Sequence, residues 1–218
     1  MKIEALHLYS RDLGQMQEFY VDELGMTQGD SGEDHFSLQC GDSVLHFWQR
    51  DDAKPYHFAF NIPSNLIKEA LIWMEDRVPP IRFEGRSIID FPAWNAQALY
   101  FYDPDFNIVE FIARQDVEKE SSAYFDARQV ISISEIGMVT DDIEALYVAL
   151  NEIKPLPIYD GTFTSFCAMG DPQGLFIVVN FLRKKWFPSG DEMYRTDFVI
   201  EGDFNVEYKG GKIRSLEV

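Results

Sequence analysis

The chain of 218 residues, 46% of them hydrophobic, is long enough to bury a core as one large domain or two small ones. Its 19 basic and 37 acidic residues give a net charge of −18, which argues against binding to nucleic acid or to an anionic membrane surface. The two cysteines, Cys40 and Cys167, lack metal-site or redox spacing, and the N-terminus has no apolar signal region, so we expect a cytoplasmic protein with reduced thiols.

The N-terminal part of the chain predicts a strand, a helix and then further strands. Alternating apolar residues make 3–9 a strand, and apolar residues at helical spacing predict a helix within 12–24, capped by Asp12. Two short strands, 36–40 and 43–49, follow around a two-residue turn.

The same order of elements restarts at Tyr56. Residues 56–62 predict a strand, and the helix that follows it ends before Pro79. Strands 97–102 and 107–113 then enclose a turn rich in Asp and Pro. The second unit therefore repeats the first.

A polar stretch, 116–129, predicts a linker, and the pattern then restarts a third time. Residues 131–139 predict a strand, Asp141 caps a helix, and 164–169 and 175–181 predict two more strands. The tail that follows contains Trp, Phe and Pro before a polar end.

Each unit is a βαβββ module, and the sequence therefore contains an internal repeat of about 50 residues. One module cannot bury the concave face of its sheet, whereas two side by side close most of a barrel. We therefore expect an α+β protein. Residues 1–115 form one two-module domain, 116–129 a linker, and 130–218 a third βαβββ module with a C-terminal tail.

A histidine in the first strand and the run DP-x-x-N-x-x-E-F at 103–111 carry a resemblance to a known group. Together with the repeated βαβββ pattern, they resemble the vicinal oxygen chelate superfamily, which includes glyoxalase I, bleomycin-resistance proteins and type I extradiol ring-cleaving dioxygenases. The 103–111 run resembles the last hairpin of that two-module domain. The resemblance implies an open barrel of paired modules around a metal ion.

The resemblance also implies metal ligands on the first and last strands of each module. Four residues occupy those places: His7, His46, His57 and Glu110. Imidazole and carboxylate groups bind Fe, Mn, Ni, Co and Zn, so the implied cofactor is one of these divalent ions. Each histidine could equally be a hydrogen-bonded core residue, and that interpretation stays open.

Glu110 carries a separate argument from the residues themselves. It shares one face of its strand with Ile108 and Ile112, and a carboxylate among apolar side chains is costly to bury without a cation. In a glyoxalase-like enzyme a metal-ligating carboxylate is also the general base, so Glu110 is the expected catalytic residue.

A second group of residues is expected to contact the substrate, because aromatic rings with a few amides suit a small organic ligand. Its members are Trp48, Trp94, Asn95, Gln97 and Tyr100. The alternative is structural, with Trp94 packing the end of the barrel and Asn95 satisfying the loop backbone.

The third module is expected to lack ligands. Gly137 occupies the place that matches His7, and Val178 lies near the place that matches Glu110. A single unpaired module with an aromatic tail indicates burial against another surface, so we expect a homodimer.

Two functions remain open at this stage. The first is a divalent-metal enzyme of the glyoxalase or extradiol-dioxygenase type that acts on a small oxygen-chelating organic substrate, either as a lyase or isomerase or as a ring-cleaving dioxygenase. Three histidines with Glu110 favour the lyase or isomerase. The alternative is a non-catalytic protein of the bleomycin-resistance type that binds a drug or an aromatic ligand. Bound metal in the purified protein discriminates between the two.

Overall fold

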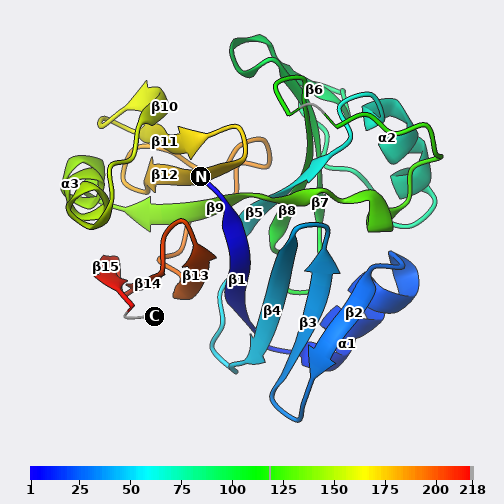
Figure 1. Cartoon of the computed structure of the whole chain (residues 1–218), viewed down its shortest axis with the longest axis horizontal. Helices are drawn as coiled ribbons and strands as arrows, with labels where there is room; N and C mark the ends of the chain where they lie inside the picture. Colours follow the sequence, from blue (N-terminus) through cyan, green and yellow to red (C-terminus); the bar gives the residue numbers. More distant parts are fainter. Residues whose placement is uncertain (118, 217–218) are drawn as a thin grey trace.

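The computed structural model describes residues 1–117 and 119–216, and it confirms an α+β protein built mostly of strands. Glu118, in the expected linker, and the last two residues lie outside the described part. Two curved sheets make up the molecule (Figure 1). No helix in the described residues is both long enough and apolar enough to cross a membrane.

The first sheet has seven strands. In spatial order they are β15 (Lys212–Ser215), β14 (Val206–Lys209), β13 (Phe198–Gly202), β1 (Ile3–Ser10), β4 (Ser43–Gln49), β3 (His35–Cys40) and β2 (Thr27–Ser31). The second sheet has eight strands. In spatial order they are β10 (Ile158–Thr162), β11 (Phe166–Asp171), β12 (Gly174–Asn180), β9 (Ser132–Thr140), β5 (His57–Ile62), β8 (Ile108–Arg114), β7 (Ala96–Tyr102) and β6 (Ile89–Phe91).

Three helices connect strands within the modules, and short helical turns lie between them. They are α1 (Leu13–Gln17), which continues as a π-helical turn (Glu18–Glu23), α2 (Ile67–Glu75) and α3 (Ile143–Ile153), with 3-10 turns at Pro92–Trp94 and Ala127–Gln129. The α1 helix begins where predicted, because the Asp12 carboxylate accepts a hydrogen bond from the backbone of Gln15 at 3.0 Å. The α3 cap is Asp142 rather than Asp141.

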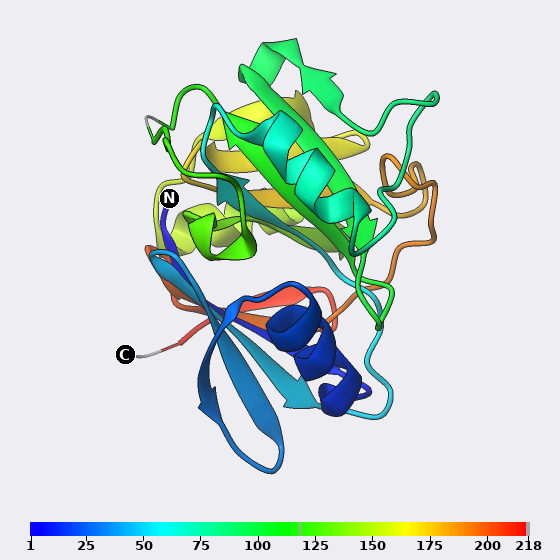
Figure 2. The same cartoon turned by 90° about the vertical axis from the view of Figure 1, so that its right-hand side faces the viewer.

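The three βαβββ modules are confirmed. In each one the last strand returns parallel to the first, so β4 lies beside β1, β8 beside β5 and β12 beside β9. Figure 2 shows α1 against the first sheet and α2 against the second. The helix-bearing faces of both sheets share one continuous apolar core.

The modules pair differently from the expectation that residues 1–115 close one barrel. The second module joins the third through antiparallel strands β5 and β9, and the first module joins the C-terminal tail through β1 and β13. Burial explains this choice. All of β5 and nearly all of β9 are buried, whereas β1 and β13 alternate between buried and partly exposed residues. Strands that are buried on both faces therefore lie inside the molecule, and half-exposed strands pair beside them.

The DP-x-x-N-x-x-E-F motif has a structural role in this fold. The Asp103 carboxylate accepts hydrogen bonds from the backbone of Asp105 and Asn107, at 3.1 and 2.9 Å. The Asn107 side chain in turn accepts from the backbone of Tyr56 at 2.7 Å, at the start of β5. The motif therefore holds the β7–β8 turn against β5, which sets the register of β8 and the place of Glu110.

Candidate metal centre

Three ionisable side chains meet on the concave face of the second sheet: His57 on β5, Glu110 on β8 and Glu135 on β9. The strand register brings them together, because Ala59 lies beside Glu110 on one side and beside Glu135 on the other. His57 is two residues from Ala59 and so faces the same way. The small alanine leaves room between the two carboxylates.

The ligand atoms of this cluster are close enough to share one ion. One ligand atom from each of the three residues lies within 4.8 Å of the others. The Nε2 atom of His57 is 3.6 Å from Oε2 of Glu110 and 4.0 Å from Oε2 of Glu135. All three side chains are buried.

The imidazole of His57 is held with a lone pair toward the carboxylates. Its Nδ1 donates to the carbonyl of Ile108 at 3.0 Å, which leaves Nε2 unprotonated on the other side of the ring. Burial lowers the pKa of His57 to about 4, so the ring is neutral at pH 7. A neutral imidazole whose second nitrogen is anchored to a carbonyl is the form that binds metal ions.

The charges around the cluster leave one carboxylate uncompensated. Glu135 forms an ion pair with the buried guanidinium of Arg114. Burial, reinforced by the charge of Glu135, raises the pKa of Glu110 well above its usual value. Two buried carboxylates therefore share one guanidinium and a neutral ring. A divalent cation would balance this arrangement, and the donor set of one nitrogen and two carboxylates fits such an ion.

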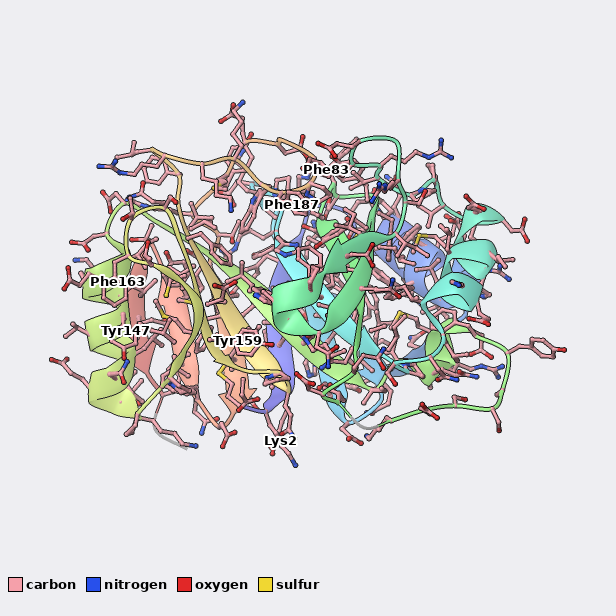
Figure 3. The ribbon with its side chains drawn as sticks, turned by 90° about the horizontal axis from the view of Figure 1, so that it is seen from above. Lys2, Phe83, Tyr147, Tyr159, Phe163 and Phe187 are labelled. Atoms are coloured by element: carbon pink, nitrogen blue, oxygen red, sulfur yellow. The ribbon has the colours of Figure 1, made fainter. Side chains whose placement is uncertain are left out.

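A cavity of about 360 Å³ opens over the cluster. The connection between β12 and β13, residues 181–197, contributes residues 184–187 to its lining, and we call it the mouth segment. The lining includes six aromatic side chains: Phe91, Trp94, Tyr100, Phe166, Trp186 and Phe187. Phe187 packs against Phe83 with ring centroids 4.8 Å apart, and the two rings are seen together in Figure 3.

Gly137 allows the mouth segment to pack closely against β9. A Cβ atom at this position would lie 2.6 Å from Cη2 of Trp186 and 3.2 Å from the backbone oxygen of His57. The absence of a side chain lets the indole of Trp186 reach within 5.1 Å of the His57 ring, measured between ring centroids. The third module was expected to contribute no ligand, yet Glu135, two residues before Gly137, belongs to the cluster.

The structure does not bring His7 and His46 to this cluster, because both lie in the first sheet. Their rings stack with centroids 4.3 Å apart. Nδ1 of His7 accepts from Trp48 Nε1 at 3.2 Å, and Nε2 then donates to Glu201 at 3.2 Å. Both nitrogens of His7 are therefore engaged, which leaves no lone pair for a metal ion.

The predicted substrate contacts are divided in the same way. Tyr100 and Trp94 line the cavity, and Trp48 is in the other sheet. Asn95 and Gln97 lie outside the cavity lining. Gln97 and Tyr100 are three residues apart on one strand, so their side chains point to opposite faces of the sheet and cannot both face the cavity. Its amide instead donates to Asp90 at 2.7 Å, while that of Asn95 donates to Asp116 at 2.8 Å.

The sequence prediction did not include Glu135 or Arg114, although both are charged residues within apolar strands. Glu135 interrupts the apolar strand ISISEIGMV, and its burial carries the cost that singled out Glu110. Arg114 ends an equally apolar strand and is only 1% exposed. An acid and a base inside two different buried strands indicate a pair that meets in the folded chain.

No protein-family model and no curated protein sequence matches the chain. Solved structures do resemble it. A Bacillus subtilis protein, named as a candidate dioxygenase, matches with a TM-score of 0.60 and 14% identity over 82% of this chain. The chain spans 63% of that protein's length.

Two further matches cover about half of this chain. A glyoxalase/bleomycin resistance protein/dioxygenase from Nocardioides has a TM-score of 0.44 and 21% identity, over 56% of this chain and 89% of its own. Lactoylglutathione lyase from Agrobacterium tumefaciens has a TM-score of 0.43 and 22% identity, over 50% and 91%. With the βαβββ modules and the Bacillus subtilis match, the chain has the fold of the vicinal oxygen chelate superfamily.

Proposed function

We propose that this chain is a divalent-metal enzyme that acts on a small organic substrate bound to the ion through two neighbouring oxygens. His57, Glu110 and Glu135 are the proposed ligands. The observation that supports this is the convergence of one neutral imidazole and two carboxylates in a buried cluster whose ligand atoms lie within 4.8 Å of one another. A bound ion there would act as a Lewis acid that lowers the pKa of a substrate hydroxyl.

The number of ligands favours a ring-cleaving dioxygenase over a lyase or isomerase. On β8, Glu110 lies beside Ala59 of β5. The equivalent residue on β12 is Ile177, which lies beside Gly137 of β9. The fourth equivalent place therefore holds an isoleucine, which supplies no ligand atom. His7 and His46, which made four ligands in the sequence argument, are in the other sheet. Three protein ligands would leave positions open on a divalent ion for two substrate oxygens and one more small molecule.

The remaining residues of the cavity have roles that follow from their positions. Glu110 is the proposed proton acceptor, because its carboxylate belongs to the cluster and lines the cavity in which the substrate would bind. Tyr100 lies opposite Glu110 on the neighbouring strand β7 and lines the cavity beside it. Trp186 and Phe187 exclude water from the space above the cluster.

Metal analysis tests the proposal. Protein purified without a metal-binding tag is expected to hold close to one Fe or Mn per chain, and His57→Ala or Glu110→Gln is expected to abolish binding. Glu201→Gln, which removes an exposed carboxylate beside His7, is the matched control and is expected to keep the metal. Metal content that is the same in all four proteins would reject the cluster as the site.

The alternative is a non-catalytic binding protein, and one observation favours it. The Arg114–Glu135 ion pair already neutralises part of the cluster without any ion. Metal-free wild-type protein that gains no stability from added Mn²⁺ or Fe²⁺ would support this alternative. The homodimer and the cytoplasmic location stay predictions, and light scattering during size-exclusion chromatography tests the first.

A further inference from the structure

A second cavity shares a wall with the one over the cluster, and the proposed chemistry leaves it unused. It measures about 470 Å³, and Trp186 contributes to the lining of both cavities. None of the three proposed metal ligands lines it. The lining includes five aromatic side chains: Tyr56, Tyr102, Phe106, Trp186 and Tyr194. We call this space the tyrosine cavity.

The tyrosine cavity carries an excess of negative charge. Its lining contains two carboxylates, Asp191 and Glu192, and no basic side chain. The Asp191 carboxylate accepts a hydrogen bond from the hydroxyl of Tyr102 at 2.5 Å, and this neutral donor leaves the negative charge in place.

One basic group lies near these two acids. The ammonium of Lys185, which is not part of the lining, donates to Glu192 at 2.6 Å. That hydrogen bond, followed by the charges of Glu192 and then Asp191, raises the pKa of Lys185, so one ammonium faces two carboxylates. Within residues 1–117 and 119–216, no basic group lies within ion-pair distance of Asp191. One negative charge at the aromatic wall is therefore left without a counter-charge.

Phe106 places an exposed ring at this wall at a cost to the backbone. Its side chain is 64% exposed, and its φ of 64° is in the left-handed region, which bulky residues rarely adopt. The turn holds it there, because the backbone N–H of Phe106 donates to the carbonyl of Asp103 at 2.9 Å. The ring contacts Tyr102, with centroids 6.3 Å apart, but buries little surface. Such a strained and exposed residue points to a role outside the packing of the chain.

An organic ammonium matches both properties of the tyrosine cavity. The faces of aromatic rings attract such a cation, and a nearby carboxylate adds to the attraction. A metal ion is a poorer match, because in the described part of the chain the group of acids and histidines able to hold one is the cluster already described. The volume is within the range of small-molecule sites.

We propose that the tyrosine cavity binds a small organic cation with alkyl groups on its nitrogen, through the rings of Phe106 and Tyr102 and the charge of Asp191. This site is separate from the metal centre and does not rest on the proposed function. Its ligand is free in solution and is recognised by charge and by the apolar shell around the nitrogen.

Two probes of the same shape isolate the charge: choline and its uncharged analogue 3,3-dimethylbutan-1-ol. Their dissociation constants are measured by calorimetry on the metal-free protein. The wild type is expected to bind choline roughly tenfold more tightly than the alcohol, because the cation interacts with several rings and one carboxylate. The preference is expected to decrease as salt is raised.

Two variants test the parts of the site, each with a matched control. Asp191→Asn is expected to weaken choline binding about fivefold, whereas Glu201→Gln, which removes an exposed acid in the other sheet, keeps the wild-type constant. Phe106→Gly is expected to weaken it about two- to fivefold, and Tyr124→Gly, which removes a ring that is 94% exposed elsewhere, is expected to have no effect.

Thermal melts separate a binding role of Phe106 from a packing role. Glycine adopts a positive φ without strain, so Phe106→Gly is expected to melt at or above the temperature of the wild type. A variant that melts well below the wild type would assign the ring to packing and overturn the inference. Equal binding of the two probes, the absence of choline binding, or an unchanged choline constant in either Asp191→Asn or Phe106→Gly would also overturn it.

Discussion

Replacement of Glu110 by Gln separates a metal ligand from a merely buried carboxyl. In the metal-free protein the carboxylate of Glu110 is disfavoured by burial and by the charge of Glu135, so its pKa is raised in the folded state. The folded chain therefore holds a proton that the unfolded chain releases above the usual value of 4.5. Stability from this group is full below that pH and falls as the pH rises through the raised pKa. Glutamine removes this loss, so metal-free Glu110→Gln is expected to be more stable than the wild type at pH 7.

His57 contributes the opposite slope and provides an internal check. Its pKa falls from 6.5 in the unfolded chain to about 4 in the folded protein. The unfolded chain takes up a proton first on acidification, so stability from His57 is present above 6.5 and is lost as the pH falls toward 4. The Glu110→Gln variant is expected to retain this acid-side loss while it lacks the decline at higher pH.

Added metal is expected to reverse the order of the two proteins. An ion that binds only the folded state at 100 times its dissociation constant stabilises it by about 2.7 kcal/mol. For a chain of this size 1 kcal/mol corresponds to roughly 2–4 °C, so the wild type is expected to melt about 5–11 °C higher with metal. Glu110→Gln loses one of three ligands and is expected to gain little.

The assay is thermal unfolding followed by circular dichroism between pH 5 and 8, with and without Mn²⁺, with Glu201→Gln as the control for loss of an exposed acid. Two results would refute the reasoning. One is a metal-free Glu110→Gln protein that melts below the wild type at pH 7. The other is an equal metal-induced shift in the two proteins.

Three further predictions follow from the same contacts. Arg114→Met leaves the Glu135 charge buried without its partner and is expected to lower the free energy of unfolding in urea by about 3–5 kcal/mol. The double variant with Glu135→Leu is expected to regain most of this stability. Equal losses in the single and double variants would contradict the proposed ion pairing. Gly137→Ala places a methyl group against the indole of Trp186, so tryptophan emission of the metal-free protein is expected to shift to the red. An unchanged spectrum would argue against close packing of Trp186 on Gly137. His7→Ala and His46→Ala are expected to change the metal dissociation constant by less than about twofold, because both rings lie in the first sheet and the cluster lies in the second; a loss near 100-fold in either would return them to the ligand set.

The local pattern of the sequence was enough to determine the modules. Alternating apolar residues, the capping Asp12 and the turn at 103–107 depend on neighbours in the chain, so the strands, the helices and the α+β class could be predicted. Glu110 could also be predicted, since the cost of burying a carboxylate follows from the apolar residues beside it.

The pairing of modules was decided only in three dimensions. Every first strand offers a free edge, and the number of modules does not say which edges meet. In the fold β5 is completely buried and pairs with β9, and this pairing places Glu135 beside Ala59, across from Glu110. The same choice puts His7 in the other sheet, where Trp48 and its acidic neighbour use both ring nitrogens. Residue type and position within a strand therefore identified candidate ligands. The distances between residues far apart in the chain, however, depend on which strands pair.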